Sequence, residues 1–128
     1  MKSIFLIDDD PIFVHLTKKI INSTNCQYAI SEFTDGELAI HHLAEIREQA
    51  DLLPDVIFLD LTLPQLGSWD FLEGLQDLYA HLLKNIDVYL LSPMIHDDDI
   101  KRSTRYPFVK SLFSKPMSEQ LLSMIAAA

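Results

Sequence analysis

The sequence is organised around one stretch, DVIFLDLTLP at residues 55–64. Four consecutive apolar residues, two of them β-branched, run straight into Asp60 and then toward Pro64. This pattern predicts a strand that is buried on both faces and ends at Asp60. A single acid after an apolar run more often begins a turn or caps a helix than forms a site. The interpretation of Asp60 therefore depends on what the other strand ends supply.

The composition indicates one soluble domain spanning residues 1–128. A chain of this length buries roughly two-thirds of the surface that it exposes when unfolded. The one cysteine, Cys26, cannot form an internal disulfide, and residues 1–4 lead directly into an apolar strand rather than a signal peptide. We therefore expect a cytoplasmic protein. No apolar run approaches the ~20 residues that span a bilayer, so we expect no membrane partner.

The charge balance argues against nucleic acid as a direct partner. Ten Lys and Arg residues stand against nineteen Asp and Glu residues, which gives a formal net charge of −9 and a pI near 4.7. Such a surface repels the phosphate backbone.

Five apolar runs alternate with five helical patterns along the chain. The strands are predicted at residues 3–7, 28–33, 56–59, 87–91 and 109–114. The helices are predicted to begin at residues 11, 36, 68, 97 and 118. The alternation predicts an α/β fold of (βα)5 type, in which helices cover both faces of a doubly wound, five-stranded parallel sheet.

Several helical side chains have predicted structural roles. Ile12, Leu16 and Ile20, with Ile21 as a further candidate, recur at helical spacing and predict the buried stripe of the first helix. Ile100 is the predicted anchor of the short fourth helix, and Trp69 suits a partner contact and simple packing equally well. Two serines are predicted to cap helices: Ser68 the third and Ser118 the last.

In parallel sheets of this kind, ligands bind beyond the carboxyl ends of the strands. Carboxylates follow two of the predicted strands there, Asp8 and Asp9 after the first and Asp60 after the third. Because such carboxylates repel one another, they predict a divalent cation, and ligands that are all oxygen favour Mg²⁺ over Zn²⁺. We expect Asp9 and Asp60 to bind the ion directly, Asp8 to bind through water, and the backbone carbonyl of Thr62 to be a further ligand. No organic cofactor is expected.

The remaining strand ends suit a phosphoryl group. Lys115 follows the fifth strand and Ser92 ends the fourth, so an ammonium and a hydroxyl are available to bind phosphoryl oxygens. The carboxylate of Asp60 would attack phosphorus in line and form an acyl phosphate.

Together these residues resemble the receiver domain of two-component response regulators. The resemblance covers essentially the whole chain and rests on Asp8-Asp9, on Asp60 within LDLTLP at 59–64, on Ser92 in the Thr/Ser position, and on Lys115-Pro116. It implies a flavodoxin-like strand order, 2-1-3-4-5. It also implies that Asp60 is the phosphoacceptor of a phosphorelay, phosphorylated from a histidine kinase or a histidine phosphotransfer protein.

The resemblance further implies a signalling domain rather than an enzyme, although such a domain would catalyse its own phosphoryl transfer and dephosphorylation. It implies a face, built by the fourth helix, fifth strand and fifth helix, that changes on phosphorylation and binds an unidentified target protein. Whether the chain forms a homodimer is not decided by the sequence.

The chain departs from the family pattern at three places. Gly67-Ser68 stands where Asp-Gly is usual, Pro93 follows Ser92, and Leu112 stands where an aromatic residue is expected three positions before Lys115. These departures leave the manner of switching open and keep a binding-only pseudo-receiver as an alternative. A phosphatase with an aspartyl nucleophile is disfavoured, because Thr62 stands where enzymes resembling the haloacid dehalogenase group place a second acid.

Overall fold

The computed structural model describes residues 2–23, 27–63, 67–115, 118, 120, 121 and 125. Its five strands are β1 (Lys2–Ile7), β2 (Tyr28–Phe33), β3 (Val56–Asp60), β4 (Asp87–Ser92) and β5 (Val109–Ser114). Its four helices are α1 (Pro11–Ser23), α2 (Gly36–Glu45), α3 (Ser68–Tyr79) and α4 (Asp97–Ser103). The predicted last helix falls largely outside the described residues. Its predicted cap is confirmed, because the Ser118 hydroxyl accepts a hydrogen bond from the Leu121 N–H at 3.0 Å.

All five strands are parallel and follow the order β2-β1-β3-β4-β5, which confirms the predicted α/β fold. Strand β3 occupies the centre of the sheet, and each of its five residues is buried. A central parallel strand needs apolar side chains on both faces, which explains the unbroken apolar run that precedes Asp60.

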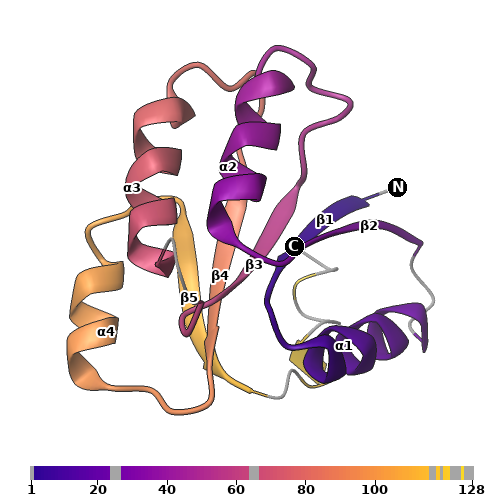
Figure 1. The fold of residues 1–128 in the computed structure, drawn as a ribbon, viewed down its shortest axis with the longest axis vertical. Helices are drawn as coiled ribbons and strands as arrows, with labels where there is room; N and C mark the ends of the chain where they lie inside the picture. Colours follow the sequence, from indigo (N-terminus) through magenta and orange to yellow (C-terminus); the bar gives the residue numbers. More distant parts are fainter. Residues whose placement is uncertain are drawn as a thin grey trace.

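The helices lie on both faces of the sheet, with α2, α3 and α4 on one side and α1 on the other (Figure 1). Alternate residues of β3 point to opposite faces. Ile57 and Leu59 therefore join the core beneath α2 and α3, whereas Val56 and Phe58 join the core beneath α1. No helix among the described residues is long and apolar enough to cross a membrane.

Helix α1 packs on the sheet with a different face from the predicted one, and of the predicted residues only Ile21 is buried. Ile12 and Leu16 are 72% and 46% exposed, and Ile20 is only half-buried. The buried residues of α1 are Phe13, Val14, Thr17 and Ile21. The helix carries apolar residues on two adjacent stripes, and spacing alone does not decide which stripe contacts the sheet. Asp10 fixes the start of the helix, because its Oδ1 accepts the N–H of Ile12 at 3.0 Å and of Phe13 at 3.4 Å.

Two other structural predictions are wrong. Ile100 is 46% exposed, and the buried residue of α4 is Ser103. Ser68 does not cap α3, because the helix begins at Ser68 and Gly67 occupies the capping position without a side-chain bond. The hydroxyl of Ser68 donates instead to the backbone carbonyl of Asp60.

Candidate functional site

Parallel pairing brings the carboxyl ends of β1, β3, β4 and β5 to one edge of the sheet. Asp60 lies opposite Leu91 of β4, and Ser92 lies opposite Ser114 of β5. The Lys115 N–H donates to the carbonyl of Ser92 at 2.9 Å, so Lys115 lies beside the end of β4. The candidate residues therefore start from the same edge, as the sequence predicts.

Asp60 is 1% exposed, and hydrogen bonds hold its carboxylate in one orientation. Its Oδ1 accepts both the N–H and the hydroxyl of Thr62, at 3.0 and 2.8 Å. Its Oδ2 lies 3.4 Å from Nζ of Lys115. The Ser68 hydroxyl bonds the carbonyl of Asp60 and thereby ties the end of β3 to the start of α3. One carboxylate oxygen thus faces the loop after β3, and the other faces the lysine.

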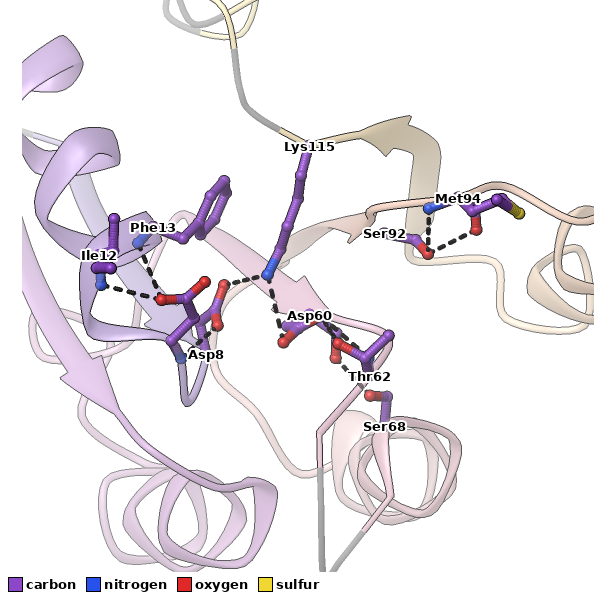
Figure 2. Close-up of polar contacts among 10 residues, drawn as sticks. Asp8, Ile12, Phe13, Asp60, Thr62, Ser68, Ser92, Met94 and Lys115 are labelled. Atoms are coloured by element: carbon purple, nitrogen blue, oxygen red, sulfur yellow. Dashed lines mark hydrogen bonds and ion pairs between the residues drawn. The ribbon is translucent and has the colours of Figure 1, made fainter.

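Lys115 lies between two carboxylates (Figure 2). Its Nζ is 2.8 Å from Oδ2 of Asp8 and 3.4 Å from Oδ2 of Asp60. The Lys115 side chain is only 12% exposed, so water supplies little of the solvation that its ammonium requires. The two aspartates are what make a buried ammonium acceptable at this position.

The Asp8 carboxyl is buried at this edge, close to Lys115 and to a second carboxylate. Burial, together with the neighbouring charge of Asp60, raises the pKa of Asp8 from 3.8 to about 6. The hydrogen bond from Lys115 and the bond from the Asp10 N–H at 2.9 Å lower the pKa, but they do not cancel the effect of burial.

The carboxylates of Asp8, Asp9 and Asp60 are placed to hold a metal ion. Each offers one oxygen, and these oxygens all lie within 4.8 Å of one another. Asp8 and Asp60 are buried, whereas Asp9 is exposed and leaves one side of the group open to water. An all-oxygen donor set with excess negative charge and a solvated side fits a hard divalent cation such as Mg²⁺.

Ser92 lies at the same edge, but its side chain turns away from Asp60 (Figure 2). The Ser92 hydroxyl is 2.7 Å from the Met94 carbonyl, to which it donates, and it accepts the Met94 N–H at 3.3 Å. Hydroxyls commonly make such local bonds in turns. The structure therefore brings together Asp8, Asp9, Asp60 and Lys115, and leaves the Ser92 hydroxyl bound within its own turn.

Phe13 belongs to the site, although the sequence patterns gave no indication of it. Its ring centroid lies 4.2 Å from Nζ of Lys115. The assignment of Ile12 and Leu16 to the buried stripe placed Phe13 on the wrong face of the helix. Asp10 was the available signal, because a cap at Asp10 fixes the rotation of the first turn.

An aromatic cluster joins α3 to α4 beside the site. Trp69 stacks on Tyr106 with 6.3 Å between ring centroids, and Arg102 lies 4.5 Å from the Trp69 ring centroid. The Tyr106 hydroxyl donates to Glu73 at 2.6 Å. Trp69 therefore has a packing role, and Tyr106 is buried between helices rather than placed on β5, where Leu112 stands.

Comparison with known proteins identifies the family and agrees with the fold. Residues 4–126 match the response regulator receiver domain family. A two-component response regulator from Cytophaga hutchinsonii is 27% identical, with a TM-score of 0.88 over 99% of this chain and 95% of that one. The phosphorylated cyanobacterial phytochrome response regulator RcpA is 28% identical, with a TM-score of 0.77 over 98% of this chain and 89% of that one. Comparison with curated protein sequences gives no significant match.

The matched range includes residues of all five strands and contains Asp8, Asp9, Asp60, Ser92 and Lys115. The five-stranded parallel fold agrees with this match. The chain belongs to the response regulator receiver domain family of two-component signalling.

Proposed function

We propose that this receiver domain accepts a phosphoryl group on Asp60 from a histidine kinase or a histidine phosphotransfer protein, with Mg²⁺ bound beside it. The observation that carries the proposal is the position of the Lys115 ammonium, 2.8 Å from Asp8 and 3.4 Å from Asp60 at the end of the central strand. Because RcpA, a relative of similar fold, is known in a phosphorylated form, the same reaction is expected here.

The ion would be held by Asp8, Asp9, Asp60 and the backbone carbonyl of Thr62. When bound, Mg²⁺ supplies positive charge for the carboxylates and for a phosphoryl oxygen. The spacing of the three carboxylates supports this assignment, because one oxygen of each lies within 4.8 Å of the others and the single ammonium of Lys115 does not balance their charge.

The residues of the chain divide the phosphoryl transfer between them. An oxygen of the Asp60 carboxylate attacks phosphorus, a new O–P bond forms, and the P–N bond of the donor phosphohistidine breaks with its electron pair passing to the imidazole nitrogen. Thr62 holds Oδ1 through two hydrogen bonds, which limits rotation of the carboxylate during attack. Lys115 exchanges its contact with Asp60 for a contact with a phosphoryl oxygen and stabilises the charge that develops there.

The loop after Ser92 is the proposed link from phosphorylation to a partner protein. A phosphoryl oxygen is a stronger acceptor than the Met94 carbonyl, so it would draw the Ser92 hydroxyl inward and break both bonds with Met94. Met94 and Ile95 are 67% and 37% exposed, which gives the loop apolar side chains for a protein contact. We place the face that changes on phosphorylation and binds the target protein on α4, β5 and the predicted last helix.

Signalling by this domain would therefore run between proteins in the cytoplasm. The net charge of −9 favours a protein target over direct contact with nucleic acid or an anionic membrane. A second copy of the chain is one target that this surface allows.

A binding-only receiver is the second candidate, and two observations favour it. The Ser92 hydroxyl points away from Asp60, and Pro93 restricts the backbone that would have to move. A phosphatase is not favoured, because Thr62 supplies a hydroxyl that already bonds Asp60 rather than the second acid that such enzymes use.

The test is to incubate the purified protein with Mg²⁺ and acetyl phosphate and to measure its intact mass. We expect a gain of one phosphoryl group in the wild type, no gain in Asp60→Asn, and a loss of labelling when EDTA removes the metal. Asp51→Asn is the matched control, since it changes an exposed aspartate away from the site. A wild type that stays unlabelled while remaining folded would favour the binding-only receiver.

A further inference from the structure

The Lys115 ammonium has a third partner besides the two aspartates. Its Nζ lies 4.2 Å from the ring centroid of Phe13, and Figure 2 shows the lysine side chain running beside Phe13 with its tip directed at Asp8 and Asp60. Asp8 and Asp60 are ion-pair partners of the ammonium, and the electron-rich face of the Phe13 ring lies close enough to attract the same positive charge.

Phe13 is firmly placed for this contact. It lies in the first turn of α1, where its N–H bonds Oδ1 of Asp10, and it is 7% exposed. The ring therefore cannot move far without disturbing the start of the helix. Because Lys115 is itself only 12% exposed, little water competes with the ring for the ammonium.

Phe13 differs from the aspartates in one respect that matters for phosphoryl transfer. A phosphoryl group on Asp60 changes the charge and the hydrogen bonding of both carboxylate partners of Lys115. The ring neither ionises nor binds phosphate, so its attraction for the ammonium persists while Lys115 exchanges one oxygen partner for another. A flexible four-carbon side chain is thereby kept at the strand edge throughout the reaction.

We propose that Phe13 is a positioning residue for phosphoryl transfer, which holds the Lys115 ammonium beside Asp60 through a cation–π contact. The proposal rests on the proposed function of Asp60 as a phosphoacceptor. It assigns to Phe13 an electrostatic role in addition to its packing in the core beneath α1.

The experiment separates ring electrostatics from packing by replacing Phe13 with phenylalanines that carry increasing numbers of fluorine atoms. Fluorination withdraws charge from the ring face but keeps the side chain apolar and aromatic. We expect the rate of phosphorylation by acetyl phosphate to fall in step with the cation-binding strength of the ring. Phe13→Leu should be roughly 5- to 30-fold slower than the wild type, and Phe13→Tyr should retain most of the rate.

Two controls make the result specific. Ile21→Ala removes buried volume from the same core about two helical turns from Phe13, so it should lower the melting temperature and keep the wild-type rate. In a Lys115→Met background, Phe13→Leu should cause no further loss of rate, because the cation is already absent.

Nuclear magnetic resonance of the unphosphorylated protein tests the contact without any reaction. The side-chain protons of Lys115 nearest the ring should be shifted upfield by the Phe13 ring current, and Phe13→Leu should abolish that shift. A wild type that is never phosphorylated would refute the proposed function of Asp60. A phosphorylated wild type with a rate independent of fluorination, or a Lys115 without the ring-current shift, would refute the role of Phe13 alone.

Discussion

Replacing Asp8 with asparagine should stabilise the metal-free protein at neutral pH. The carboxyl of Asp8 is 6% exposed, and its pKa rises from 3.8 to about 6 on folding, chiefly because of burial. The folded protein therefore holds this proton more tightly than the unfolded chain. Stability is greatest when Asp8 is protonated, and it falls as the pH rises through the interval between these two values.

The size of the effect follows from the same values. One pKa unit corresponds to ~1.4 kcal/mol, so the raised pKa of Asp8 costs the folded protein up to about 3 kcal/mol above pH 6. Asparagine has nearly the same shape and no charge, so Asp8→Asn removes this cost. The substitution also removes the ion pair with Lys115. The pKa of about 6 already includes the stabilising effect of that ion pair on the Asp8 carboxylate, so no further correction to the free energy is needed.

The assay is urea unfolding of both proteins in EDTA at pH about 7.5 and about 4.5. We expect Asp8→Asn to be more stable than the wild type at the higher pH, and the difference to shrink at the lower pH, where Asp8 is largely protonated in the folded state. Saturating Mg²⁺ should stabilise the wild type more than the variant, because the ion binds the folded carboxylates. A variant that is less stable at the higher pH, or a difference that grows on acidification, would refute the reasoning.

Three further substitutions test neighbouring parts of the site. Ser68→Ala removes the only side-chain bond from α3 to the carbonyl of Asp60 among the described residues and should lower the unfolding free energy by about 1–3 kcal/mol; an unchanged urea midpoint would contradict this. Tyr106→Phe removes the bond to Glu73 and should cost about 1 kcal/mol by the same assay, whereas a stabilised variant would show that the bond contributes nothing. Asp9→Asn should weaken Mg²⁺ binding by at least about 10-fold in calorimetric titration without loss of fold, and an unchanged affinity would exclude Asp9 as a ligand.

The central strand and its acid could be predicted because two independent constraints coincide there. A strand in the middle of a parallel sheet must be apolar on both faces, so β3 has an unbroken apolar run, and the run stops where the sheet ends at Asp60. The same reasoning applied to the other strands placed Asp8 and Lys115 at the same edge. In the folded protein, pairing of the parallel strands places Nζ of Lys115 2.8 Å from Oδ2 of Asp8 and 3.4 Å from Oδ2 of Asp60.

Side-chain directions on the helices could not be predicted in the same way. Helix α1 has apolar residues on two stripes, and only its docking on the sheet selects Phe13 over Ile12. The role of Ser68 was also inaccessible, because a serine near a helix start caps the helix in most settings, and here the nearby Asp60 carbonyl competes for the hydroxyl. Similarly, the Ser92 hydroxyl bonds Met94 because that partner lies only two residues away.

The central claim is that Asp60 carries the phosphoryl group, and locating that group tests it most directly. After reaction with acetyl phosphate and Mg²⁺, reduction by borohydride traps an acyl phosphate, and peptide mass mapping then identifies the modified residue. The trapped product should lie at position 60 and be absent from Asp60→Asn. A product at any other residue, or a phosphoryl mass gain that persists in Asp60→Asn, would contradict the claim.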